Sequence, residues 1–215
     1  MSQELVQNVE NLVVQLLIRL GERRTGDGDA AGQAVLVTSA RPGEGKSFIA
    51  EALARHAVRM IAGRVLLVDA NLEHPAVHES FRLPMQPGLT DFLSADSKGR
   101  SSTVHRDVVP GLDILTAGRT GSSTLFLRQE PMAALFRQVT SEYELTVIDG
   151  GALRMAGRSL LAHVAGAVIV VDAGSTRREV VSGTLAGLHI ARQQVLGLVL
   201  NKRPQYIPRI LYRFL

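Results

Sequence analysis

The sequence predicts a doubly wound α/β fold, in which a mainly parallel sheet carries helices on both faces. Short runs of valine, isoleucine and leucine alternate along the chain with helix-length segments. These runs are almost continuously apolar, which indicates strands buried on both faces. Alternation of such strands with helices is typical of a parallel sheet. A helix precedes this domain and a short tail follows it.

Each predicted element rests on a local pattern. Strands are expected at six apolar runs, 34–38, 64–68, 113–115, 145–148, 167–171 and 195–200, with helices between them at 47–61, 75–81, 89–93, 130–141, 159–163 and 176–194. Residues 4–20 form a further helix, because apolar side chains recur there at every third or fourth position. The next segment is polar and glycine-rich, like a flexible linker. We therefore divide the chain into an N-terminal helix (1–21), a linker (22–32), an α/β domain (33–203) and a tail (204–215).

The composition excludes several classes of protein. The chain has 215 residues, of which 46% are hydrophobic and 20% charged, which excludes a disordered or collagen-like protein. It contains no cysteine, which excludes disulfides, thiolate metal sites and a cysteine nucleophile. The longest uncharged run, 159–171, has 13 residues, whereas a spanning helix needs about 20. Because the N-terminus also lacks a signal peptide, we expect a cytoplasmic protein.

The positive charge lies at one end of the chain. The net charge is +4, but the last acidic residue is Glu179, and five bases follow it. The first 179 residues therefore carry 19 bases and 20 acids, a net charge of −1. A protein that binds nucleic acid usually carries a basic stripe with interleaved aromatic residues. The nearly neutral body and its unpatterned aromatic residues argue against nucleic acid as a partner.

The segment ARPGEGKS, residues 40–47, follows an expected strand and opens an expected helix. Gly43 and Gly45 let backbone N–H groups converge on phosphate oxygens, and the helix N-terminus adds partial positive charge. Lys46 can reach the β- and γ-phosphates, and the Ser47 hydroxyl can bind Mg²⁺. The alternative is an ordinary glycine-rich turn. The pattern predicts a phosphate loop that binds ATP through Arg41, Pro42, Gly43, Glu44, Gly45, Lys46, Ser47 and Phe48.

Two aspartates each end a buried apolar run, Asp69 after RVLLV and Asp149 after LTVI. Open α/β sheets place their chemistry at the carboxyl ends of strands. Mg²⁺ bound to phosphates is commonly held by one or two carboxylates, directly or through water. We therefore expect Ser47, Asp69 and Asp149 around the metal. Either aspartate could instead cap a helix.

Taken together, ARPGEGKS, VLLVDANLEHP, PGLTDFLSA, GLDILTAG, ELTVIDG and GLVLNK resemble, in order and spacing, the bacterial tyrosine kinases of capsule and exopolysaccharide export. The resemblance spans roughly residues 34–203. It implies a P-loop fold related to the partition and cell-division ATPases, with ATP and Mg²⁺ as cofactors. It also implies catalytic roles for Lys46, Asp69 and Asp149, and a position near the adenine for Asn201. In that family a transmembrane chain-length (co-polymerase) protein is the activating partner.

The sequence departs from the family pattern at four places. The second acidic motif usually has two aspartates, but its second position here is Asn71, which cannot act as a base. Gly150-Gly151-Ala152 replaces the usual Thr-Pro-Pro, and the first helix lacks the two arginines that dock subunits in a ring. The tail holds two tyrosines, Tyr206 and Tyr212, as candidate phosphate acceptors.

The tail also has an amphipathic pattern. Ile207, Ile210, Leu211 and Phe214 would share one helical face, and Arg209 and Arg213 another. Such a segment can lie on the anionic inner face of the cell membrane, dock on a partner, or pack on its own domain.

The sequence thus predicts an ATP-dependent tyrosine autokinase that regulates exopolysaccharide or capsule polymerisation and export, in which neighbouring copies can associate. Two alternatives stay open. One is a catalytically weak ATP-binding switch, a pseudokinase, favoured by Asn71 and the two-tyrosine tail. The other is a membrane-cycling ATPase of the partition or cell-division kind, favoured by Arg41 and the amphipathic tail.

Overall fold

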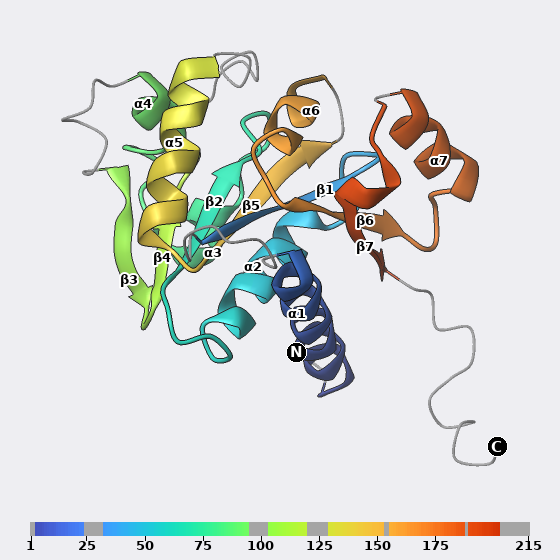
Figure 1. Ribbon diagram of the computed structural model, residues 1–215, viewed down its shortest axis with the longest axis horizontal. Coiled ribbons are helices and arrows are strands. Elements are labelled where there is room, and N and C mark those ends of the chain that lie inside the picture. Colours follow the sequence, from blue (N-terminus) through green and yellow to red (C-terminus); the bar gives the residue numbers. More distant parts are fainter. Residues whose placement is uncertain are drawn as a thin grey trace.

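The computed structural model describes residues 3–23, 32–94, 103–119, 129–152, 155–187 and 189–202. Their centre is a seven-stranded sheet of order β3-β4-β2-β5-β1-β6-β7, drawn in Figure 1. Every neighbouring pair is parallel except β3 with β4. The predicted fold class is thereby confirmed. The strands are β1 (Gln33–Ser39), β2 (Val65–Ala70), β3 (His105–Val109), β4 (Leu112–Leu115), β5 (Leu145–Ala152), β6 (Gly166–Asp172) and β7 (Val195–Asn201).

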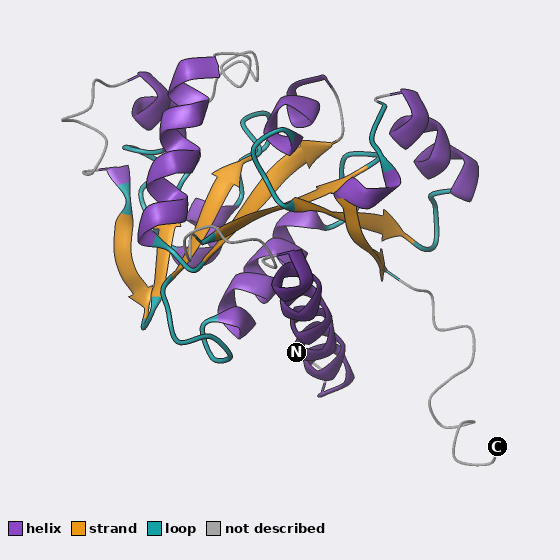
Figure 2. Ribbon diagram, viewed as in Figure 1, coloured by secondary structure: helices purple, strands orange, loops and turns teal. Residues whose placement is uncertain are grey.

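Helices cover both faces of this sheet, as Figure 2 shows. Side chains alternate between two cores: Ala34 and Leu36 of β1 face one, Val35 and Val37 the other. A strand that buries both of its faces needs the continuous apolar run seen in the sequence. One face packs against α4 (Leu89–Ser94), α5 (Gln129–Glu142), α6 (Met155–Leu161) and α7 (Arg178–Gly187), and the other against α1 (Gln3–Arg23), α2 (Lys46–Ala57) and α3 (Val77–Phe81).

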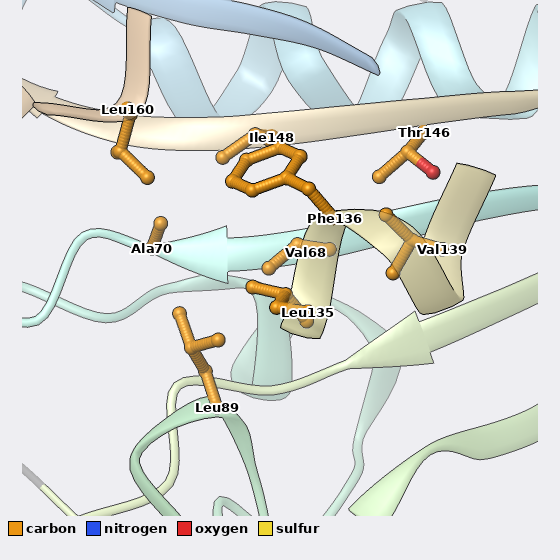
Figure 3. A pocket seen from close by; sticks show the side chains of 9 residues that line it. All are labelled: Val68, Ala70, Leu89, Leu135, Phe136, Val139, Thr146, Ile148 and Leu160. Atoms are coloured by element: carbon orange, nitrogen blue, oxygen red, sulfur yellow. The ribbon is translucent and has the colours of Figure 1, made fainter. Parts of the chain in front are cut away.

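The core under α5 is closely filled. Figure 3 shows the small apolar space that remains between α5 and strands β2 and β5. Its volume is about 10 Å³, so it holds at most one water molecule. Phe136 and Ile148 are among its lining side chains. This void is a packing defect and offers no space for a ligand.

The edge strand β3 is absent from the sequence prediction, because its residues HRDVV lack a continuous apolar run. Polar contacts hold it in the sheet. Arg106 of β3 and Arg64 both donate to the buried carboxylate of Asp113 in β4. The Tyr143 hydroxyl donates to the same carboxylate at 2.8 Å. An antiparallel edge strand secured by ion pairs carries no period that sequence inspection detects.

Several predicted element boundaries are wrong, among them those of 47–61 and 159–163, which are α2 (Lys46–Ala57) and α6 (Met155–Leu161) in the structure. The single helix expected over 176–194 is instead α7, ending at Gly187, followed by a separate 3₁₀ turn at Arg192–Gln194. His189 adopts a left-handed backbone (φ 53°), and its N–H and that of Ile190 donate back to the last turn of α7, which ends the helix. Helix α1 continues to Arg23, two residues into the predicted linker, and positions 24–31 lie outside the described residues.

Among the described residues, no helix is both long enough and apolar enough to cross a lipid bilayer.

Candidate functional site

The predicted phosphate loop joins the end of β1 to the start of α2. Gly43 and Gly45 both adopt left-handed backbone conformations, with φ of 80° and 92°. At Gly45 a Cβ would also overlap the side-chain amide of Asn201. No side chain caps the start of α2, so its first N–H groups stay open to an anion. The loop therefore has the backbone that a phosphate site needs.

The side chain of Glu44 holds the phosphate loop in place through hydrogen bonds. Its side chain is almost fully buried, and its carboxylate accepts hydrogen bonds from the N–H of Arg41 (2.8 Å), the N–H of Asp172 (3.1 Å) and the hydroxyl of Thr176 (2.6 Å). The phosphate loop is thus tied to the segment between β6 and α7. Only the backbone of Glu44 is left to contact a nucleotide.

A second brace comes from the end of β7. The Asn201 amide donates to the carbonyl of Glu44 at 2.9 Å. Lys202 donates to the carbonyl of Gly43 at 2.6 Å, and its ammonium lies 3.6 Å from the carboxylate of Asp172. The structure therefore places Asn201 against the backbone of the phosphate loop. The contact of Lys202 with the phosphate loop was not predicted, although Lys202 ends the GLVLNK segment that contributes to the resemblance.

Lys46 begins α2 and is buried, with 6% of its surface exposed. Burial lowers the pKa of its ammonium, while the nearby charges of Asp149, Glu44 and Glu73 oppose that shift. An ammonium in this position is partly stripped of water and faces carboxylates. It therefore gains most when a phosphate arrives to share its charge.

Asp149 lies within β5, in register with Asp69 of β2. Its side chain is fully buried, and neither carboxylate oxygen has a hydrogen-bond partner among the described residues. Burial raises the pKa of Asp149 to about 7, and the charge of Asp69 adds to that shift. Ser47 and Lys46 lie near enough to lower it in part. A buried carboxylate with two free oxygens is costly without a cation to bind.

Asp69 is equally buried but has partners. Its carboxylate accepts hydrogen bonds from the N–H groups of Asn71, Ala76 and Val77, each at 3.1 Å. Burial raises the pKa of Asp69, and these three amides oppose the shift. Asp69 thus fixes the segment that leads into α3, as a capping carboxylate does, while its charge still acts on Asp149.

Asn71 takes part in the same turn. Its side-chain amide donates to the carbonyl of His74 at 2.8 Å, and its side-chain oxygen lies close to Gly151. At position 71, where the bacterial tyrosine kinases usually carry an aspartate, this chain therefore has a neutral side chain that stabilises a local turn.

Sequence reasoning missed Glu51, on the second turn of α2. It is half-buried, and burial raises its pKa, with a further contribution from the charge of Asp69. The charge of Glu51 in turn raises the pKa of Asp149. The signal was its spacing: Glu51 follows Ser47 by four residues, so both lie on one helical face. Glu51 therefore adds a third carboxylate of raised pKa to the pair Asp69 and Asp149.

The residues present fit a magnesium ion bound together with phosphates. The described residues contain no group of three or more histidine and acidic side chains that would hold a metal by themselves. Mg²⁺, however, is usually bound through one or two carboxylates, phosphate oxygens and water. The unpartnered oxygens of Asp149, near Ser47, are such a donor set.

The other residues predicted to contact the nucleotide lie on the exposed surface of the phosphate loop and of the first turn of α2. Arg41, Pro42 and Gly43 are exposed, and Phe48 in the first turn of α2 is 44% exposed. Tyr206 and Tyr212 lie outside the described residues.

Comparisons with known proteins were made on sequence and on structure. No protein-family model matches the chain. It is 32% identical over 172 residues to the tyrosine-protein kinase YwqD of Bacillus subtilis (strain 168), an alignment that covers 79% of this chain and 72% of YwqD. It is 36% identical over 178 residues to the protein named EpsB from Ralstonia solanacearum, covering 80% of this chain. The chain matches only 23% of the length of EpsB.

A further relative is the succinoglycan biosynthesis transport protein ExoP of Rhizobium meliloti (strain 1021). The identity is 28% over 175 residues, covering 78% of this chain and 22% of ExoP. Among solved structures, the kinase domain of VpsO superposes with a TM-score of 0.71 at 26% identity. That match covers 94% of this chain and 100% of the VpsO domain.

Proposed function

Because the chain belongs to the bacterial tyrosine-protein kinases, we propose that it transfers the γ-phosphoryl group of ATP to tyrosine. The observation that carries the proposal is Asp149, whose two buried, unpartnered oxygens lie close to Ser47 and Lys46 of the phosphate loop. An ordinary glycine-rich turn would not justify burying a carboxylate and an ammonium side by side at its end. A phosphate loop with a metal site does.

Each residue has a role in this proposal. The loop amides and Lys46 bind the phosphates, and Ser47 with Asp149 binds Mg²⁺, which supplies charge neutralisation on the phosphate oxygens. The tyrosine oxygen forms the new bond to phosphorus as the bond to the β-phosphate oxygen breaks and ADP leaves. Asp69 accepts the phenolic proton. Little covalent chemistry is asked of the protein, so positioning and charge carry the reaction.

The acceptor is expected in the tail. The chain has three tyrosines. Tyr143 is 3% exposed, and its hydroxyl is engaged with Asp113 and Arg106. A buried, hydrogen-bonded phenol cannot reach the phosphate loop. Tyr206 and Tyr212 are therefore the acceptors in this proposal, on the same chain or on a neighbouring copy.

The biological setting follows from the family. We infer that the chain acts in exopolysaccharide or capsule production, at the inner face of the cell membrane, with a transmembrane chain-length protein as its activating partner. The name of the relative ExoP, a succinoglycan biosynthesis transport protein, supports this setting.

One observation favours a second candidate, a nucleotide-dependent switch that phosphorylates little. Asn71 is neutral, and its amide is engaged with the carbonyl of His74. It can neither accept a proton nor bind Mg²⁺ as strongly as a carboxylate would. Such a switch would bind MgATP in the same loop and signal through its partner.

Mass spectrometry separates the two candidates. The purified chain is incubated with MgATP, with and without the cytoplasmic segment of its membrane partner, and phosphotyrosine is mapped. We expect phosphate on Tyr206 or Tyr212. Phosphotyrosine in neither condition, together with intact ATP binding, would favour the switch.

The matched control is Lys46→Ala, assayed by calorimetric titration with ATP. Because Lys46 supplies the one loop ammonium that can reach the phosphates, we expect loss of ATP binding with an unchanged circular-dichroism spectrum. ATP affinity equal to that of the original chain would refute the position of the site.

A further inference from the structure

A second hollow lies away from the phosphate site, between α7 and strands β6 and β7. Its volume is about 620 Å³, large enough for several side chains of a peptide. Figure 1 shows α7 beside these two strands at one end of the sheet. Its floor is apolar, formed chiefly by Val181, Leu185, Ile190, Val195, Leu198 and Leu200. We call it the α7–β7 groove.

The part of this groove that is formed by the edge strand β7 is exposed to solvent. Leu198 and Leu200 are 59% and 67% exposed, more than any other large apolar side chain among the described residues. Among the described residues β7 pairs with no strand other than β6, and Arg19 of α1 donates to the carbonyl of Leu196 at the start of β7. The stretch that carries Leu198 and Leu200 therefore has no strand on its other side. Two adjacent leucines on an open edge strand indicate a surface that another segment covers.

The rim of the groove is basic. Arg178 and Arg192 both line it. Within the described parts of the chain, neither guanidinium forms an ion pair. Two arginines above an apolar floor suit an occupant that combines large apolar side chains with a phosphate or carboxylate.

The groove reaches the point where the tail begins. Ala173 in its wall donates its N–H to the carbonyl of Asn201, the last residue of β7. Lys202 is then held by the carbonyl of Gly43. Four residues separate Lys202 from Ile207, and an extended chain spans about 3.3 Å per residue, so Ile207 can reach about 16 Å. The apolar stripe of the tail can therefore reach Leu198 and Leu200.

We propose that the α7–β7 groove binds this chain's own tail, 204–215, and binds it more tightly once a tail tyrosine is phosphorylated. Ile207, Ile210, Leu211 and Phe214 supply apolar side chains to the floor. The unmodified tail brings Arg209 and Arg213 toward a basic rim, which weakens docking. A phosphotyrosine carries about −1.5 to −2 charges and would pair with Arg178 and Arg192.

Docking of the tail would act on the phosphate loop. Thr176 lines the groove, and its hydroxyl donates to Glu44, which braces the phosphate loop. The product tail would thus be held beside the loop that modified it. This inference rests on the proposed tyrosine phosphorylation for its biological meaning, but not for its test.

The test uses synthetic peptides, so that it does not depend on kinase activity. The receptor is the full chain with Ile207→Ser, Ile210→Ser, Leu211→Ser and Phe214→Ser, which leaves the groove free. The probes are fluorescein-labelled peptides of residues 203–215, unmodified or phosphorylated at Tyr206 or Tyr212. Binding is followed by fluorescence anisotropy.

We expect at least one phosphopeptide to bind about tenfold more tightly than the unmodified peptide. Adding Arg178→Gln and Arg192→Gln should abolish that difference. Adding Leu198→Ser and Leu200→Ser should weaken all the peptides at least about tenfold. Val14→Ser with Ile18→Ser, exposed apolar positions on α1, should change nothing.

Three results would overturn the proposal: no saturable binding of any peptide, equal affinity with and without phosphate, or binding insensitive to the leucine substitutions. Failure here leaves the autophosphorylation experiment untouched. Conversely, a chain without kinase activity would still bind the synthetic phosphopeptide.

Discussion

At the scale of single residues, the strongest conflict in the structure lies at Asp149. A carboxylate with no hydrogen-bond partner is buried beside Asp69, in register on the next strand. Such an arrangement lowers the stability of the empty protein, and buried carboxylates of raised pKa are typical of functional sites. Asp149 should therefore show opposite effects on stability and on activity.

The substitution Asp149→Asn tests the cost of burying this carboxylate, because it changes how the unfolding free energy depends on pH. The folded-state pKa is about 7 against an ordinary value of 3.8, so the native state binds the proton more tightly than the unfolded state. The stability that this group contributes is full below pH 4 and is lost as pH rises through about 7. Relative to the original chain, the unfolding free energy of the asparagine variant should therefore rise by about 4 kcal/mol between pH 4 and pH 8.

Urea denaturation at several pH values, with EDTA present, measures that gap. The same variant should lose Mg²⁺-dependent ATP binding, because the neutral amide cannot replace the carboxylate. A stability difference that stays constant across this pH range would show that Asp149 does not titrate as the geometry requires.

At the scale of elements, Glu44 joins three parts of the fold: the phosphate loop, the end of β6 and the segment that leads into α7. Glu44→Ala would leave the Asp172 N–H and the Thr176 hydroxyl without their buried acceptor. We expect a loss of about 1–3 kcal/mol in unfolding free energy and about tenfold weaker ATP binding. Thermal unfolding and calorimetric titration measure the two effects, and Glu79→Ala, an exposed acid on α3, is the control.

Helix α1 raises a second question at this scale, namely how far its apolar stripe contributes to the stability of the domain. Val9, Val13, Leu16 and Leu20 are buried in the core shared with α2. Leu16→Ala should therefore lower the unfolding free energy by about 2–4 kcal/mol.

The matched substitution is Ile18→Ala, since Ile18 lies on the same helix but is 52% exposed. It should change the unfolding free energy by less than about 1 kcal/mol. Chemical denaturation of both variants decides the matter: equal effects would mean that α1 does not pack on the domain.

At the scale of the whole molecule, the candidate site depends on distant parts of the chain. Asp149 and Asn201 come from two strands and lie beside the phosphate loop, and Asp69 of a third strand lies next to Asp149, an arrangement that exists only when the sheet is complete. Any ligand of this site therefore binds the folded state and not the unfolded one. MgATP should accordingly stabilise the entire fold.

At 100 times its dissociation constant, MgATP should raise the unfolding free energy by about 2.7 kcal/mol. Scanning fluorimetry with an external dye measures the corresponding rise in melting temperature, since the chain has no tryptophan. ATP with EDTA should give a smaller rise, and Lys46→Ala none. An equal rise in that variant would place nucleotide binding elsewhere.

The sequence by itself determined the elements whose residues carry their own signal. The buried strands appear as continuous apolar runs, and the phosphate loop as glycines with Lys46 and Ser47, because both depend on neighbours along the chain. The roles of Glu44 and Lys202, the strand β3 and the α7–β7 groove were decided only by the tertiary structure. Each arises from contacts between residues far apart in sequence, such as Glu44 with Thr176, and no local period records which partner a side chain will meet.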